Sequence, residues 1–309
     1  MIILFIEFNF MKMKTLKYLI TGIMLIINIP FYSQTPVKNE QVITLKSVTK
    51  NVSVRLLAES KAVLLRRLAF MNLQNVQIAL NDPKSELVIT VRDSVNNETL
   101  SDILLIRGHL NFYETRNRED VLKYFGKQKS GCIQDAFTFL HLSDSIHRRP
   151  ESVFGIADAK DTSSINACFS TKEVRGKIPD YVKLLWTVYP GVNNQCELYC
   201  ISSSDNTFNE QSIKEVHADF KNPELPELCI TFKETVWQSW KDATLRNMNK
   251  PIALVIDNKV YFAPRIQGEI PHGKISLTGH GLSKAEIRKL VAIISGGTLP
   301  LKFAIAGNH

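Results

Sequence analysis

The side chains with the most evident chemical potential lie in the last quarter of the chain. Gly279 and Gly281 precede a predicted helix, and backbone N–H groups at a helix start can hold an anion. The stretch has neither the Gly-x-Gly-x-x-Gly pattern of dinucleotide sites nor the Lys-Ser/Thr pair of a P-loop. A tight entry turn is therefore the preferred interpretation.

Other candidates in this region also have structural explanations. Asp257 offers a carboxylate, but it stands in a turn pattern. Ser283 is followed three residues later by Glu286, which is a capping box rather than a nucleophile with His and Asp partners. His272 and His280 share a loop region without the neighbouring Cys or carboxylate ligands of a metal site. We therefore predict no catalytic, cofactor-binding or metal-binding residues and no enzyme activity.

Aromatic and sulfur side chains complete the candidates. Trp237 and Trp240 lie three apart on a predicted helix, which fits the core, whereas an exposed pair would mark a polypeptide-binding surface. An odd number of cysteines leaves at least one unpaired, and most fit buried positions. Cys196 and Cys200 are too far apart along an ideal strand to bond to each other, and they could meet only across a turn or in a helix. The five cysteines are Cys132, Cys168, Cys196, Cys200 and Cys229.

The segment 250–302 has the clearest secondary-structure pattern. It predicts strands at 252–256, 260–263, 275–278 and 301–306. A helix begins after Ser283 and ends at Gly296-Gly297, before Pro300. Its inward face is predicted to hold Ile287, Leu290, Val291 and Ile294, with Lys284, Arg288 and Lys289 mostly off that face.

The first third of the chain predicts a similar set of elements. After a tether or first strand up to 48, a helix at 54–70 places Leu57, Leu64, Leu65 and Leu68 on one face, with Arg66 and Arg67 pointing away. A hairpin at 76–91, a helix at 99–107 and a strand at 109–113 follow. Near the other end, a strand at 228–232 and a helix at 234–248 precede the segment described above.

Both ends thus repeat one order of helices and strands, which predicts an α+β fold. We expect a ferredoxin-like base, in which an antiparallel sheet carries helices on one face. A polar stretch with short apolar pieces separates the two ends and predicts an inserted α/β head subdomain. The predicted divisions are a signal peptide (1–33), a linker (34–50), the first half of the base (51–115), the head (116–226) and the second half of the base (227–307).

Composition and charge narrow the class of protein. The 309 residues are 44% hydrophobic and 22% charged, as in ordinary globular proteins. The formal net charge is +8. The sequence has no dense Lys/Arg block and no aromatic-basic interleaving, so we predict no nucleic-acid partner.

The N-terminus has the layout of a signal peptide. Lys12, Lys14 and Lys17 precede an uncharged apolar run at 18–32 that is short for a membrane span. We predict cleavage near Ser33-Gln34, with an uncleaved N-terminal anchor as the alternative; Met11 or Met13 is a candidate start. A mature chain that still carries residue 25 on N-terminal sequencing would contradict cleavage. The remainder is predicted to be soluble.

Four stretches carry a resemblance to one family. In order and separation they resemble the first large extracytoplasmic domain of SecD, an accessory subunit of bacterial protein export. The third and fourth are the more specific, and the likeness covers about half of the chain. The stretches are Arg66–Ile78 (RRLAFMNLQNVQI), Leu104–Tyr113, Thr244–Pro264 (TLRNMNKPIALVIDNKVYFAP) and Gly279–Pro300, which includes LSKAEIRKLVAIISGGTLP.

The resemblance implies a base with a head and a non-enzymatic role in export. In SecD a five-helix membrane bundle follows this domain, whereas this sequence ends at His309, so proton-driven pulling is not carried over. We expect an extracytoplasmic protein that binds unfolded or translocating polypeptide, with the export channel or other envelope proteins as further partners. It would touch the membrane only through an uncleaved N-terminus. The alternative is an envelope ligand-binding protein or hydrolase that reuses the base, which predicts a pocket of converging titratable groups within 116–226.

Overall fold

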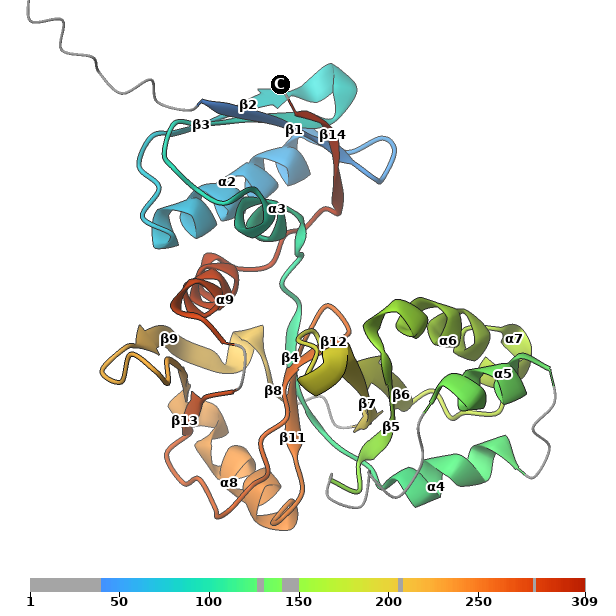
Figure 1. Cartoon of the computed structure of the whole chain (residues 1–309). Helices are drawn as coiled ribbons and strands as arrows, with labels where there is room; N and C mark the ends of the chain where they lie inside the picture. Colours follow the sequence, from blue (N-terminus) through green and yellow to red (C-terminus); the bar gives the residue numbers. More distant parts are fainter. Residues whose placement is uncertain (1–39, 127–130, 141–149, 205–207, 280–281, 309) are drawn as a thin grey trace, which may run out of the picture. The chain divides into compact units, whose positions relative to one another are not determined.

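The structure is a computed structural model that describes residues 40–126, 131–140, 150–204, 208–279 and 282–308. It is a mixed α/β chain whose paired strands are all antiparallel (Figure 1). The predicted signal peptide, including Ser33-Gln34, lies outside the described residues. The helices are α2 (Val54–Phe70), α3 (Asn97–Leu105), α4 (Arg118–Leu122), α5 (Cys132–Phe139), α6 (Thr162–Phe169), α7 (Lys172–Arg175), α8 (Trp237–Arg246) and α9 (Lys284–Gly296).

The strands form four sheets. The first has the order β14-β1-β3-β2 and the second β12-β11-β4-β8, while two three-stranded sheets have the orders β13-β10-β9 and β5-β7-β6. The strands are β1 (Gln41–Ser47), β2 (Val76–Asn81), β3 (Glu86–Val91), β4 (Leu110–Glu114), β5 (Val153–Asp158), β6 (Val182–Trp186), β7 (Gln195–Ser202), β8 (Phe208–Asn209), β9 (Ile213–Asp219), β10 (Glu227–Phe232), β11 (Ile252–Ile256), β12 (Lys259–Phe262), β13 (Lys274–Leu277) and β14 (Phe303–Asn308).

The first sheet carries α2 and α3 on one face (Figure 1). Helix α2 has the predicted bounds and begins at Ser53, whose side chain accepts a hydrogen bond from the Leu56 N–H. Alternate residues of β1 and β3, such as Leu45 and Leu87, pack against the apolar faces of the two helices. The first and last strands of the described chain therefore meet in one small unit.

Helix α2 departs from its predicted orientation at two residues. Leu65 was expected inside but is 38% exposed, and Arg67 was expected outside but is fully buried. The buried face runs through Ser60, Val63 and Leu64, so it is rotated from the leucine positions toward 67. The buried face is shifted because α2 packs against α9 as well as against the first sheet, so residues on a second side of the helix are also buried.

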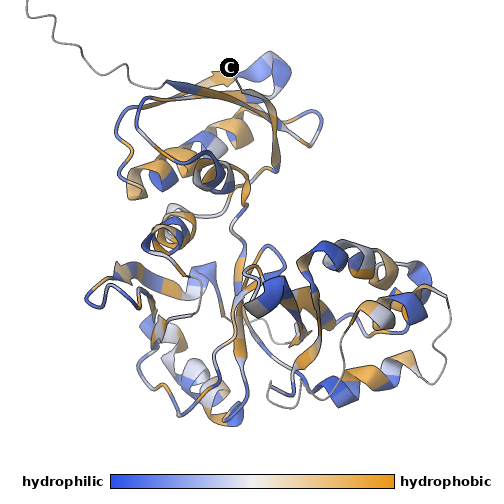
Figure 2. Ribbon diagram, viewed as in Figure 1, coloured by the Kyte–Doolittle hydropathy of each residue, from blue (hydrophilic) through white to orange (hydrophobic). Residues whose placement is uncertain are grey.

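The second sheet is covered on both faces. All five residues of β11 are buried. Leu254 faces a core shared with the β13-β10-β9 sheet, α8 and α9, whereas Val255 faces a core shared with the β5-β7-β6 sheet. A strand apolar on both faces needs cover on both sides, and Figure 2 shows β11 in apolar colours throughout.

Aromatic rings fill the first of these cores. Trp240 of α8 is 2% exposed and packs edge-on against Phe112 and Phe208 and tilted against Phe232. Trp237 is half-buried, donates from Nε1 to the Phe232 carbonyl and stacks edge-on with His272. Both tryptophans therefore serve the core, as predicted.

The strand pairing differs from the predicted second half of the base. Of the strands that the structure describes within the predicted second half of the base, β14 alone pairs in the β14-β1-β3-β2 sheet, while β10 to β13 lie in two other sheets. The physical reason is the double-sided burial of β11, which a base with helices on only one face cannot supply. The element order of the two ends repeats, but the sheets they build do not.

Candidate functional site

Arg67 lies at the centre of a buried meeting point. Its guanidinium donates five hydrogen bonds to four backbone carbonyls: Nη1 to Ile103 and Ile106, Nη2 to Arg107 and Gly297, and Nε again to Gly297. The Nη2 distances to Arg107 and Gly297 are 2.8 and 2.7 Å. These carbonyls belong to the end of α3, the segment after it and the residue after α9. A single side chain thus holds together three separate parts of the chain.

The two glycines beside Arg67 are required by its position. A Cβ on Gly108, which has φ +86°, would lie 2.6 Å from Arg67 Nη2. A Cβ on Gly296 would meet the Arg67 side chain and come within 3.1 Å of its backbone N and Cα. The close approach of α2 to α9 therefore depends on glycine at 296, and the guanidinium site depends on glycine at 108.

Asp257 completes this meeting point from the β11–β12 turn. Its carboxylate accepts the backbone N–H groups of Gly108 and His109, each at 3.0 Å. Burial lowers the pKa of Arg67 to about 10, against the opposing effect of the Asp257 charge, so the guanidinium stays protonated at neutral pH. We call Arg67, segment 106–109, the 257–258 turn and residues 296–298 the junction.

The junction unites the four stretches of the resemblance. Arg67 comes from the first, segment 106–109 from the second, Asp257 from the third, and Gly296 with Gly297 from the fourth. Two connections run side by side through it: Leu299 N–H donates to Arg107 O, and Thr298 Oγ1 donates to Gly108 O. The motifs that carry the likeness thus build a structural joint, and Asp257 has a structural role there.

A partly buried ionic cluster around Lys289 lies beside the junction. Lys289 of α9, predicted mostly off the buried face, is 7% exposed. Its Nζ lies 2.6 Å from Asp102 of α3 and 2.9 Å from Glu286, which also accepts a 2.7 Å hydrogen bond from Tyr189. Burial lowers the pKa of Lys289, but hydrogen bonds to Asp102 and Glu286 outweigh it and raise the pKa overall. The cluster ties α9 to α3.

We predict a coupling free energy of about 1–2 kcal/mol between Lys289 and Asp102, because contacting ionic residues in one network couple measurably. The measurement is a double-mutant cycle of Lys289→Met and Asp102→Asn by urea denaturation. The folded-state pKa of Lys289 is raised, so the coupling is fully present at neutral pH and is lost as the pH rises above the ordinary lysine value of 10.5 and through the higher folded-state value.

The exposed pair Arg55–Glu59 on α2 is the control for that cycle, since an i,i+4 ion pair in solvent is screened by water and couples only weakly. Equal coupling in the two pairs would contradict a structural role for Lys289.

An open apolar slot lies between the β13-β10-β9 sheet and the second sheet. Its volume is about 350 Å³. Side chains of Phe112, Trp240, Ile252 and Leu254 form its floor, and β13 and residues 264–270 form its two walls. The slot is lined mainly by apolar groups and sits over the aromatic core. Sequence reasoning did not find it, because its walls come from a short strand and an irregular segment.

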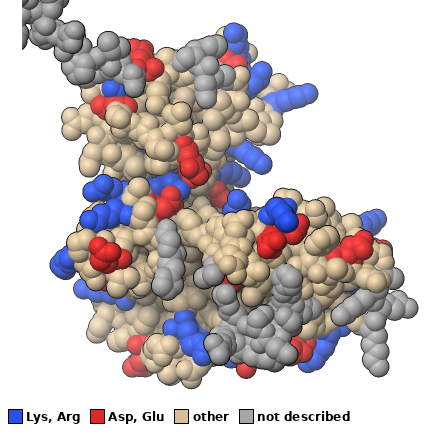
Figure 3. Space-filling view, in the orientation of Figure 1, with Lys and Arg blue, Asp and Glu red and all other residues tan. Residues whose placement is uncertain are grey.

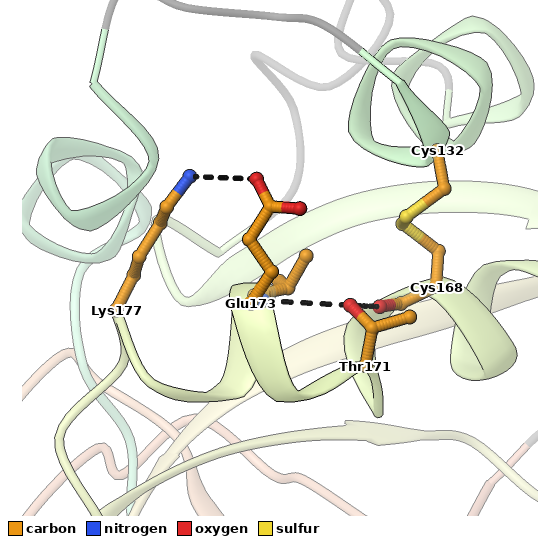
Figure 4. The surroundings of a disulfide bond; sticks show 6 residues. Cys132, Cys168, Thr171, Glu173 and Lys177 are labelled. Carbon is orange, nitrogen blue, oxygen red and sulfur yellow. Dashed lines mark hydrogen bonds and ion pairs between the residues drawn. A yellow bond between two sulfur atoms is a disulfide. The ribbon is translucent and has the colours of Figure 1, made fainter.

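A disulfide fastens the helices that cover the β5-β7-β6 sheet. Cys132 of α5 and Cys168 of α6 are bonded, with Cα atoms 5.6 Å apart (Figure 4). Thr171 Oγ1 donates to the Cys168 carbonyl at 2.8 Å, next to the Lys177–Glu173 ion pair. Cys196 and Cys200 lie on one strand and are not bonded to each other, as predicted, and Cys229 is also free.

Pockets within 116–226 test the alternative of a hydrolase or ligand-binding site. One is lined by Asp135, Phe139 and the disulfide, and another by Arg175 and Lys183 together with apolar residues. Neither gathers an acid, a base and a nucleophile among the residues that the structure describes. These linings give no support to the catalytic alternative.

The remaining sequence candidates have structural roles where they are described. Ser283 caps α9 by accepting the Glu286 N–H. His272 packs on Trp237, while His280 and Gly281 lie outside the described residues. Within the described ranges, no group of three or more His, Cys, Asp or Glu residues could hold a metal, and none of the helices is long and apolar enough for a membrane span. On the face in Figure 3, acidic and basic side chains are interspersed.

Known proteins resemble this chain in sequence and fold. Residues 188–301 match the family described as SecDF, P1 head subdomain. The protein translocase subunit SecD of Rhodothermus marinus is 30% identical over 152 residues, which are 48% of this chain and 24% of that protein. SecDF of Thermus thermophilus is 28% identical over 81 residues, 26% of this chain and 11% of that protein. A crystal structure of SecDF in its super-membrane-facing form aligns with a TM-score of 0.51 at 16% identity, over 94% of this chain and 34% of that chain.

In sequence, residues 188–301 are similar to the P1 head subdomain of SecDF, and in fold the chain is similar to the matching part of SecDF. The sequence is similar to the SecD family, as the four sequence stretches indicated. The matched part covers about a quarter or less of each of the two relatives. Proteins of this family are non-enzymatic accessory factors of translocation, in agreement with the prediction that the chain is not an enzyme.

Proposed function

We propose that this chain assists protein export by holding unfolded polypeptide on the outer side of the cytoplasmic membrane. The apolar slot carries the proposal. Its apolar floor is formed by Phe112, Trp240, Ile252 and Leu254, which are buried below the open slot. An unfolded chain exposes apolar side chains that can enter such a site. The slot also falls within the part that matches the P1 head, apart from Phe112. Further partners would be the export channel or other envelope proteins.

The architecture that supports this function is a small base joined to the rest of the chain through the junction. We infer a ferredoxin-like base made of β1, α2, β2, β3, α3 and β14, in a revision of the predicted boundaries. Its support is the helix-strand order together with the antiparallel sheet order β14-β1-β3-β2, which is that of a split β-α-β fold. Everything between α3 and β14 is then one large insertion that carries the slot.

An extracytoplasmic, periplasmic location fits the covalent chemistry. Disulfides persist in oxidising compartments and are rare in the cytosol, and Cys132–Cys168 is bonded in this chain. The predicted signal peptide gives the route by which the chain would reach that compartment.

The test is binding of a reduced, carboxymethylated model polypeptide, followed by fluorescence anisotropy. Replacing Ile275, a half-buried residue of the slot wall, by Glu is expected to weaken binding at least about tenfold, because a charge would enter the apolar site. Leu225→Glu is the matched control, since Leu225 is 53% exposed and lies outside the slot lining. A parent chain that does not bind the polypeptide, or equal weakening by both variants, would overturn the proposal.

A further inference from the structure

Strand β13 presents its edge to the apolar slot. All four of its residues, Lys274 to Leu277, line the slot. A strand face would contribute only alternate residues, because successive side chains point to opposite sides. Consecutive lining therefore places the backbone of β13 at the wall. This agrees with its position at the end of the β13-β10-β9 sheet (Figure 1).

The register shows which backbone groups of β13 face away from β10. Phe232 N–H donates to Gly273 O at 2.9 Å, and the pairs that follow are Ile230 with Ile275 and Leu228 with Leu277. Hydrogen-bonded and non-hydrogen-bonded pairs alternate along an antiparallel ladder. The N–H and C=O groups of Lys274 and Ser276 therefore point away from β10, toward the slot.

The opposite wall is also made of backbone. Seven consecutive residues, 264 to 270, line it. Its ends are fixed, since Ile266 N–H donates to Lys250 O and Ile270 N–H donates to Thr244 Oγ1. Between them, Gln267 to Glu269 make no backbone–backbone hydrogen bond among the described residues. The slot thus has a free strand edge on one side, an unpaired backbone segment on the other, and an apolar floor.

We propose that the slot binds its polypeptide by strand addition: an extended segment pairs with the outward N–H and C=O groups of β13, and alternate apolar side chains enter the floor. This rests on the proposed polypeptide-binding function and specifies how that site recognises its substrate. Main-chain hydrogen bonds give affinity that is the same for most residue types, while the floor selects segments with alternating apolar residues. Such a site accepts many unfolded sequences and disfavours proline, which has no N–H.

Backbone methylation of the peptide separates this mode from simple apolar contact. The probe is a fluorescent eight-residue peptide of alternating Val and Thr, and the comparison peptide carries N-methyl groups on alternate residues. A second comparison peptide carries them on the other alternate set. We expect at least tenfold weaker binding for the set that faces β13. If both methylated peptides bind within twofold of the parent, strand addition is wrong while polypeptide binding stands.

A protein variant tests the same hydrogen bonds from the other side. Ser276→Pro removes one outward N–H, and proline is tolerated on a strand at a sheet edge. Ala218→Pro is the matched control at the opposite edge: Ala218 of β9 pairs with Leu228, whose bonding groups point to β13. We expect at least tenfold weaker peptide binding by Ser276→Pro and a change within twofold by Ala218→Pro. If circular dichroism shows that Ser276→Pro does not fold, the methylated peptides alone test strand addition. If the unmethylated peptide does not bind to the unmodified protein, the proposed function itself is wrong.

Discussion

Replacing Arg67 by Met is expected to lower the free energy of unfolding by at least about 3 kcal/mol. The change removes the Arg67 donor from the carbonyls of Ile103, Ile106 and Gly297. The Arg107 carbonyl also loses it but keeps the Leu299 N–H. Each buried acceptor that loses its partner costs about 1–3 kcal/mol. Urea denaturation followed by far-UV circular dichroism measures the effect, and hydrogen exchange in α2 and α9 locates it.

The neighbouring residue supplies a control of the same chemistry. Arg66 is exposed and donates one hydrogen bond, from Nε to Gly296 O at 3.1 Å. Arg66→Met should cost about 1 kcal/mol or less. Arg67→Lys keeps the charge but loses the planar fork of donors, so it should fall closer to Met than to the parent. If Arg67→Met costs no more than Arg66→Met, the junction does not hold the parts of the chain together.

Replacing both Cys132 and Cys168 by Ser is the second large perturbation. The bond closes a loop with a sequence separation of 36, and a loop of that length corresponds to about 4 kcal/mol in chain entropy. The loss should be concentrated in α5 and α6, where the apolar core includes Ile133, Ile165 and Phe169. Hydrogen exchange of the α6 amides measures the local free energy of opening.

Cys229→Ser is the control for the disulfide, because Cys229 is a free, half-buried thiol. Reduction of the parent with dithiothreitol should reproduce the double mutant, and the double mutant itself should not respond to the reductant. Equal α6 protection in parent and double mutant, or two free thiols at these positions by mass spectrometry, would contradict a stabilising bond.

The local elements of this fold were largely predictable. Apolar periodicity and turn residues placed α2, the β2–β3 hairpin, β11 and α9 within a few residues of their bounds. The Ser283 cap was also predictable, because capping depends on residues three apart. Structural features that depend on residues close together in the chain could therefore be predicted from the sequence.

The buried cations could not be predicted in the same way. Arg67 and Lys289 were placed on outer faces because cations usually are. Each is buried because its helix packs on two sides, and its charge is satisfied by groups far away in sequence: Gly297 for Arg67 and Asp102 for Lys289. The only available signal was that both stand among buried apolar positions of their helices.

The assignment of strands to sheets also depended on distant partners. Strands β10 to β13 repeat the pattern of the first third of the chain, yet β10 pairs with β9 and β13, and β11 pairs with β4 and β12. The period of apolar residues along a strand does not show which strands are neighbours. The burial of β11 on both faces, however, favours a place for it in a sheet that is covered on both sides. The apolar slot lies between two of these sheets. It could not be predicted because the sequence does not show which strands pair.

Photo-crosslinking from the slot tests the central claim, polypeptide binding, most directly. A benzoylphenylalanine placed at Gln267 in the slot wall should form an adduct with a defined unfolded polypeptide and not with its folded form. The same group at Ala58, exposed on α2, should give no adduct above background. No adduct from position 267, or equal adducts from both positions, would contradict the proposal that this slot holds polypeptide during export.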